Sequence, residues 1–294
     1  MTFVLLLIVA WSASLRAQSL GEGIRALDAG RLDEAEHFFA GEVGNHPDSG
    51  DAYFYLGVTR FRAGDSSAAL VHLERAVSLT PSNWMVWKTI GIVTTSTGDL
   101  ERAGQALGKA CELAPDDEEA CYFLARNRHI TGQYEAARDP FEKALRAARK
   151  QMLARIHRAV ALNFSALSMP AEAEFHFRKA IQSTALTAPG GEDPKVDFGA
   201  FLFRQGRTEE ALGPLERAVQ EAPASPRANT ELGRVLLHTG RLEAAAAHLE
   251  RAVAADPGNW NARLLLGNAF LRLGRTADGE REMRLGQEGW ARKK

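Results

Sequence analysis

Small and apolar residues recur along the chain at intervals of 34 residues. Ala69, Ala103 and Ala245 are each followed by leucine four positions later and by alanine three positions after that. Positions i, i+4 and i+7 lie on one face of an α-helix, so this spacing predicts amphipathic helices. Ala35 and Ala137 keep the same step, which extends the pattern over a large part of the chain.

Glycines and prolines divide the pattern at the same interval. The glycines are Gly30, Gly64, Gly98 and Gly132, and later Gly206, Gly240 and Gly274. The prolines are Pro47, Pro81 and Pro115, and later Pro223 and Pro257. Glycine tolerates positive φ and allows a tight turn after a first helix, whereas proline lacks an N–H and stops a second helix. A period of 34 residues therefore predicts a repeated helix–turn–helix unit.

Eight such units account for nearly the whole chain. They are placed at 16–49, 50–83, 84–117, 118–151, 154–187, 192–225, 226–259 and 260–293. No glycine or proline occurs between Phe141 and Ala166, which predicts a longer continuous helix or an altered joint between the fourth and fifth units. Residues 188–191 read Ala-Pro-Gly-Gly, which is turn chemistry between the fifth and sixth units. One unit cannot bury its apolar stripe alone, so the units are expected to stack into a single domain over 18–294, with a bend at the joints into halves 18–187 and 192–294 as the alternative.

These residues resemble the tetratricopeptide repeat (TPR) family. The second unit carries Tyr53, Leu56, Gly57, Ala69, Leu73, Ala76 and Pro81, and the third carries Trp87, Ile90, Gly91, Ala103, Leu107, Ala110 and Pro115. The seventh carries Leu232, Gly233, Ala245, Leu249, Ala252 and Pro257, whereas the fifth departs, with Ser168 and Ala185 at the glycine and proline positions. The resemblance implies an all-α, right-handed α-solenoid whose concave face, lined by first helices, binds a partner peptide or helix.

Composition and motifs argue against other functions. The chain has 294 residues, 36 Lys and Arg against 37 Asp and Glu, so it lacks the basic surplus of a general nucleic-acid binder. His72, His176 and His248 occupy one equivalent repeat position, which spreads them along a solenoid instead of gathering them around a metal ion. With the units filling the chain, no length remains for a catalytic domain. We therefore expect a non-catalytic scaffold with no cofactor and no metal. The alternative is an enzyme with a shallow site in the groove, which no catalytic motif in the sequence supports.

The N-terminus carries a candidate targeting segment. Residues 3–11 are uncharged and apolar, a length that fits the central region of a secretory signal peptide and is too short to span a bilayer. We expect residues 1–17 to be a signal peptide and the protein to be exported, either to a periplasm or to the outside. If the segment stays uncleaved, the alternative is a subunit for envelope assembly that is anchored in a membrane by its N-terminus.

Cys111 and Cys121 are the two cysteines of the chain. Cys111 falls near the end of the second helix of the third unit, and Cys121 near the start of the next helix. Antiparallel helices would place them opposite one another, which permits a disulfide. Two separate buried thiols, acting as small apolar residues, are the equally weighted alternative.

The groove positions of the family indicate where a partner would bind. In the fourth and fifth units these positions hold Tyr122, Phe123, Arg126, His129, Arg155 and Arg158. Aromatic residues beside arginines are frequent at interaction hot spots, and arginine pairs with carboxylates in a bidentate way, so an acidic or carboxylate-ending segment of a partner protein is expected. A solvated, arginine-rich face is the alternative. A second, more apolar patch is expected at Phe54, Tyr55, Phe61 and Arg62.

The groove lacks the two-carboxylate clamp by which some family members bind chaperone tails. Lys88 matches the start of that clamp, but Ile92 and Phe123 occupy the positions that should carry asparagine. Binding of a chaperone tail is therefore not expected.

Overall fold

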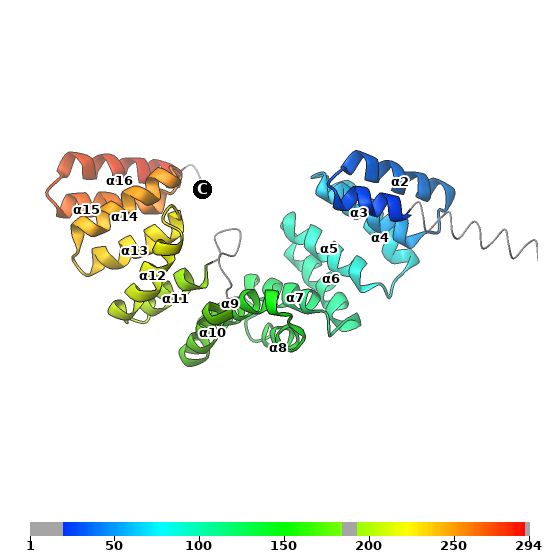
Figure 1. Ribbon diagram of the computed structural model, residues 1–294, viewed down its shortest axis with the longest axis horizontal. Coiled ribbons are helices and arrows are strands. Elements are labelled where there is room, and N and C mark those ends of the chain that lie inside the picture. Colours follow the sequence, from blue (N-terminus) through cyan, green and yellow to red (C-terminus); the bar gives the residue numbers. More distant parts are fainter. Residues whose placement is uncertain (1–19, 184–192, 292–294) are drawn as a thin grey trace, which may run out of the picture. The chain divides into compact units, whose positions relative to one another are not determined.

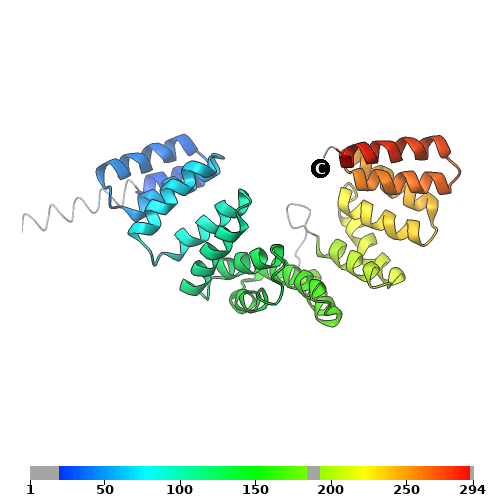
Figure 2. The ribbon, with the colours of Figure 1, turned by 180° about the vertical axis from the view of Figure 1, so that it is seen from behind.

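A computed structural model describes residues 20–183 and 193–291 of the protein. Within these ranges all regular secondary structure is helical, which confirms the all-α prediction. The chain forms two compact units, Met1–Arg149 and Lys150–Lys294 (Figures 1 and 2). The predicted signal peptide at 1–17 and the expected turn at 188–191 lie outside the described residues.

The first unit is a stack of antiparallel helix pairs. A helical segment at 20–28 precedes its seven named helices. These are α2 (Leu32–Asn45), α3 (Gly50–Arg62), α4 (Ser66–Leu79), α5 (Trp84–Ser96), α6 (Leu100–Leu113), α7 (Glu118–Ile130) and α8 (Arg138–Ala147). Helices α3 and α4, α5 and α6, and α7 and α8 form the pairs, and α2, α4 and α6 also pack on the next first helix. The first helices α3, α5 and α7 contact one another in sequence and form one face, called here the first-helix face.

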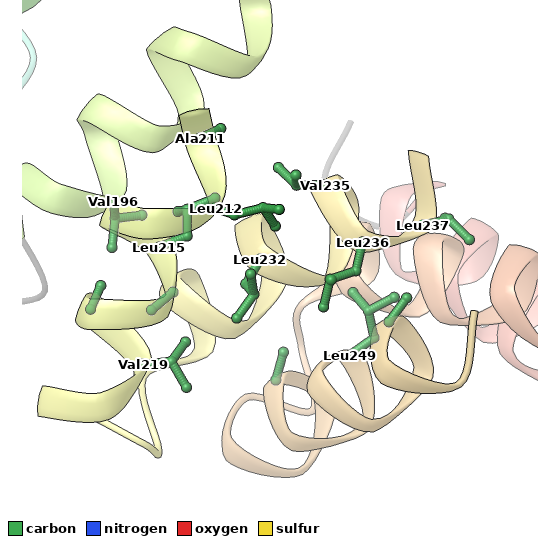
Figure 3. Close-up of a cluster of buried hydrophobic side chains, with 14 of the residues drawn as sticks. Val196, Ala211, Leu212, Leu215, Val219, Leu232, Val235, Leu236, Leu237 and Leu249 are labelled. Atoms are coloured by element: carbon green, nitrogen blue, oxygen red, sulfur yellow. The ribbon is translucent and has the colours of Figure 1, made fainter. Parts of the chain in front are cut away.

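The second unit repeats the same arrangement. Its helices are α9 (Lys150–Ala166), α10 (Pro170–Ser183), α11 (Pro194–Arg204), α12 (Thr208–Glu221), α13 (Pro226–His238), α14 (Leu242–Ala255), α15 (Trp260–Arg272) and α16 (Thr276–Ala291). A continuous core runs through it, and Figure 3 shows leucines and valines of α11 to α14 meeting between the helix pairs. Because each pair buries one stripe against the next pair, the core is a seam rather than a single centre.

Glycine ends the first helix of seven repeats with positive φ, as the sequence predicts. Gly64 and Gly98, for example, have φ of +88° and +84°. Ser168, at the equivalent position after α9, has φ of +58° and is the only non-glycine residue with positive φ in the described chain. A side chain in this region costs free energy because its Cβ approaches the backbone. The irregular fifth repeat therefore keeps the positive-φ turn, although serine stands where the other repeats have glycine.

A second set of glycines lets the two helices of a repeat approach closely. A Cβ added to Gly91 on α5 would lie 2.4 Å from Cγ of Leu107 on α6. The equivalent distance for Gly233 and Leu249 is 2.6 Å. The leucine side chain occupies the space that a methyl group would need, so these positions must be glycine for the helices to cross at this distance.

The joint between α8 and α9 is not a continuous helix, so of the two alternatives left open by the sequence the longer continuous helix is wrong. Helix α8 ends at Ala147, and Ala148 is extended, with φ of −62° and ψ of 123°. Glu118, which is 2% exposed, accepts hydrogen bonds from the backbone N–H and the Nε of Arg149, the latter at 2.8 Å. A carboxylate from the start of α7 thus satisfies a backbone donor where the helix breaks, which removes the need for glycine or proline there.

The repeat-equivalent histidines each contact the first helix of their own repeat. Nδ1 of His176 lies 2.9 Å from Nδ1 of His157, and Nδ1 of His248 lies 2.9 Å from Oδ1 of Asn229, both 19 residues apart. His72 lies against the ring of Tyr53, again 19 residues away, at a centroid distance of 6.3 Å. Burial lowers the pKa of His176 to about 4, and burial and the Lys179 charge lower the pKa of His157. These histidines serve as contacts between paired helices.

Cys111 on α6 and Cys121 on α7 form a disulfide with a Cα–Cα distance of 4.8 Å. The sequence left this pairing open between a bond and two separate thiols. The crosslink joins the third and fourth repeats at the ends of their adjacent helices.

Substitution of Ser168 by glycine is expected to stabilise the protein by about 1 kcal/mol, because glycine adopts positive φ without strain. Urea denaturation measures the change, and Gly98→Ser is the matched control, expected to destabilise by a similar amount. A lower urea midpoint for Ser168→Gly would contradict the reading of this turn.

Removal of the disulfide is expected to lower the free energy of unfolding by roughly 2–3 kcal/mol, because the crosslink restricts the unfolded chain. The double variant Cys111→Ser/Cys121→Ser, compared with the oxidised protein by urea denaturation, gives the size of the effect. Thiol titration of the denatured, unreduced protein should find no free thiol, and two free thiols would contradict the bond.

Stability is expected to fall as the pH is lowered from about 6.5 to about 4. In this window the unfolded state binds a proton on His176 that the folded state excludes, so acidification favours unfolding. The variant His176→Gln should lose less thermal stability than the parent between pH 7 and pH 5, roughly the upper part of that window. Equal losses in both proteins would show that this histidine does not carry the effect.

Candidate partner-binding face

Helix α7 supplies four of the eight candidate groove residues in the first unit, and α3 supplies the other four. Asp117 caps its start, with Oδ1 accepting from the backbone N–H of Ala120 at 2.7 Å. The helix packs on α6 behind it and beside α5 on the first-helix face (Figure 1). The cap and the disulfide at Cys121 both fix the N-terminal turn of α7, and so determine where its later side chains lie.

A pocket of about 160 Å³ opens between α5, α6 and α7. It is lined by Ile92, Thr95, Ser96, Leu107, Phe123, Arg126, Asn127 and Ile130. The sequence predicted Phe123 and Arg126 for a binding surface, and the structure brings both to this pocket. The sequence analysis assigned no binding role to Ile92, Leu107 or Ile130. The 34-residue register does place Ile92 and Ile130 on the same helix face as Arg126. Apolar residues at these positions are, however, equally typical of the hydrophobic core, so the sequence alone did not indicate a pocket.

The uncharged polar side chains of the lining donate hydrogen bonds within the protein. Thr95 donates its hydroxyl to the carbonyl of Gly91 at 2.7 Å, and Ser96 donates to the carbonyl of Val93 at 2.7 Å. Asn127 donates its amide to the carbonyl of Leu100 at 2.9 Å. The wall therefore presents mainly apolar surface to the pocket.

Arg126 is the charged residue of the lining. Its guanidinium lies 5.7 Å from the ring centre of Tyr122, a cation–π contact that uses the face of the group. Within the described ranges, none of the ion pairs includes Arg126. Lys88, by contrast, is held by Glu119 at 2.8 Å. The N–H donors of Arg126 are thus the ones that remain for a carboxylate at this pocket.

The placement of Tyr122 at the groove surface is wrong. Tyr122 is 1% exposed, with the ring of Phe123 at a centroid distance of 5.5 Å and the guanidinium of Arg126 beside it. A large aromatic ring gains more free energy by burial than by exposure, and here the neighbouring side chains cover it. Phe123 and His129 are half-buried, and the His129 ring meets Tyr134 edge-on at 5.2 Å.

Arg155 and Arg158 belong to α9 and thus to the second unit. Arg155 is exposed. Arg158 is 14% exposed, and its Nε donates to Oδ2 of Asp197, a buried residue of α11 that also pairs with Arg227 of α13. Arg158 therefore has a structural role, because its charge neutralises an internal carboxylate that would be costly to leave unpaired, and its contact with a partner stays a prediction.

The second patch takes part in packing between repeats. Phe54 and Phe61 are half-buried against the core that holds Val86 and Ile90. Tyr55 stacks on Phe39 at a centroid distance of 5.3 Å, and burial raises the pKa of its hydroxyl.

Arg62 has a structural partner in the preceding repeat. It donates to the carbonyl of Leu27 at 2.9 Å, and Arg272 makes the equivalent bond to Leu237 at 2.7 Å, both 35 residues away. The arginine therefore satisfies the end of the preceding first helix.

Neither a metal centre nor a membrane-crossing helix is found in the part of the chain that the structure describes. No three histidine, cysteine or acidic side chains of residues 20–183 and 193–291 gather closely enough to hold a metal ion. Over the same ranges, each helix is too short or too polar to cross a bilayer.

Comparison with known proteins identifies the repeat. Family models described as "Tetratricopeptide repeat" match residues 20–83 and 201–259, residues 240–288, and residues 118–151. Together these ranges cover more than half of the chain.

Two relatives are similar to short segments of this chain. Superkiller protein 3 of Schizosaccharomyces pombe is 28% identical over 101 residues, which is 34% of this chain and 7% of that protein. Cellulose synthase operon protein C of Komagataeibacter xylinus is 36% identical over 67 residues, which is 23% of this chain and 5% of that protein. The matches thus span less than a tenth of these relatives.

Solved structures share the fold at low identity. A tetratricopeptide repeat protein from Parabacteroides merdae matches with a TM-score of 0.65 at 19% identity, over 87% of this chain and 98% of that one. Cut9 in the APC/C hetero-tetramer Cut9–Hcn1 matches with a TM-score of 0.64 at 16% identity, over 84% and 48% of the two chains. From the family matches and the helix pairs, the chain belongs to the tetratricopeptide repeat family.

Proposed function

We propose that this protein is a non-catalytic scaffold that binds an acidic or carboxylate-ending segment of a partner protein on the first-helix face of its first unit. Tetratricopeptide repeat proteins generally mediate protein–protein interactions, and their fold is typical of non-enzymatic scaffolds. The partner segment binds as a peptide or helix along α3, α5 and α7, with Arg126 as its principal contact.

The observation that carries this proposal is the state of Arg126. Arg158 of the predicted patch is bound to an internal carboxylate, that of Asp197. Arg126, in contrast, contacts only the face of the Tyr122 ring among the interactions described for it. A guanidinium beside an apolar pocket is partly desolvated, so an ion pair formed there is stronger than one on an open surface.

We further propose that the protein acts outside the cytosol. The apolar segment at 3–11 fits a secretory signal, and the Cys111–Cys121 disulfide fits an oxidising compartment. N-terminal sequencing of the protein from its own cells separates a cleaved, exported form from one that keeps the segment as an anchor.

Substitution of Arg126 by alanine is expected to weaken capture of the partner by about tenfold or more, because a charge-assisted hydrogen-bonded pair is lost. Partners captured by the full chain from extracts of its own cells are quantified by mass spectrometry at two salt concentrations. Capture by the parent should fall with added salt, and the Arg126→Ala variant should show a smaller salt dependence.

The control is Arg146→Ala on the second helix α8, which removes the same charge from an exposed side chain of the same unit. It should leave capture unchanged. Arg158→Ala is unsuitable as a second test because it would leave Asp197 with one partner fewer and destabilise the fold. Capture that survives Arg126→Ala at moderate salt, with the fold intact by circular dichroism, would overturn the assignment of this face.

A further inference from the structure

We infer that the pocket between α5, α6 and α7 binds one large aliphatic side chain of the partner, next in sequence to an Asp or Glu held by Arg126. This inference rests on the proposed function and specifies the segment that the scaffold recognises. It commits to an aliphatic–acidic pair of residues in the partner protein.

The walls of the pocket favour an apolar occupant. Ile92 and Leu107 line it from α5 and α6, and Phe123 and Ile130 line it from α7. Ile130 is 53% exposed although it is a large aliphatic residue, so its burial by a ligand would remove apolar surface from water.

The same walls reject a polar occupant. The hydroxyls of Thr95 and Ser96 and the amide N–H of Asn127 are bonded to backbone carbonyls of α5 and α6. A neutral polar side chain buried beside these groups would lose its bonds to water and find few donors apart from those of Arg126, which costs free energy. The preference for an aliphatic group therefore comes from internal hydrogen bonding as well as from composition.

The size of the pocket fits a single side chain. At about 160 Å³ it lies below the usual range for sites of cofactors and small metabolites, roughly 300–1,000 Å³. A small pocket on the side of a helical stack is suited to anchor one residue of a longer segment.

The charge of the rim specifies the neighbouring residue. Arg126 lies in the lining itself, so a carboxylate that it binds must be close to the buried side chain along the partner chain. The two glutamates in the first turn of α7 have other partners, Glu118 with Arg149 and Glu119 with Lys88, and do not compete for Arg126. The remaining charge is positive, and it complements an acidic residue.

Blocked tetrapeptides test the inference directly. Ac-Gly-Leu-Asp-Gly-NH2 is titrated into the full chain, and binding is followed by NMR shifts of the methyl groups of Ile92, Leu107 and Ile130. The shifts should map to these residues. The matched peptides with Ala for Leu, or Asn for Asp, should bind about tenfold more weakly, because each loses one of the two contacts. Equal binding of the three peptides, shifts that map elsewhere, or no binding would overturn the inference.

A pocket-filling variant separates this inference from the proposed function. Ser96 is exposed in the last turn of α5, so Ser96→Phe should fill the pocket while the fold stays intact by circular dichroism. It should abolish binding of the Leu-Asp peptide and weaken partner capture, and Ile130→Ser, which removes one apolar wall, should weaken both. Partner capture that depends on Arg126 but is unaffected by Ser96→Phe would overturn the pocket inference and leave the scaffold standing. Capture that is indifferent to Arg126→Ala, Ser96→Phe and Ile130→Ser would overturn both.

Discussion

The close contact between a glycine of one helix and a leucine of its partner is the constraint on which the other packing depends. At Gly91 the space for a Cβ is taken by Leu107, and the same holds at Gly233 with Leu249. This contact sets how near the two helices of a repeat lie, and that distance fixes which side chains line the first-helix face. A solenoid has no central core to compensate for an error at this contact, because each pair is stabilised only by its neighbours.

Most other contacts follow the repeat and are therefore local in the sequence. The histidine contacts span 19 residues, and the bonds from Arg62 and Arg272 to the preceding first helix span 35. Where the sequence departs from the repeat, individual side chains maintain the fold instead. Glu118 satisfies the broken helix end at Arg149, and Ser168 keeps a glycine turn at some cost in backbone strain.

The capacity to bind a charged partner depends on which arginines are not already engaged in ion pairs within the folded protein. Arg158 and Arg126 look alike in the sequence, since both occupy groove positions of the family. Folding gives Arg158 a buried carboxylate partner, Asp197, and gives Arg126 the face of Tyr122. The arginine that keeps its donors lies beside an apolar pocket, where water screens an ion pair with a carboxylate ligand less than on an open surface.

The sequence by itself determined the helix–turn–helix repeat, its period and the positions that need glycine. These follow from local chain geometry, because positive φ and helix termination depend on one residue and its near neighbours. Only the tertiary structure decided that Tyr122 is buried, that Arg158 is paired with Asp197, and that Ile92, Leu107 and Ile130 meet in a pocket. Each of these depends on side chains from two or more helices, and a repeat pattern gives the same residue type at the same position regardless of what the neighbouring helix places against it.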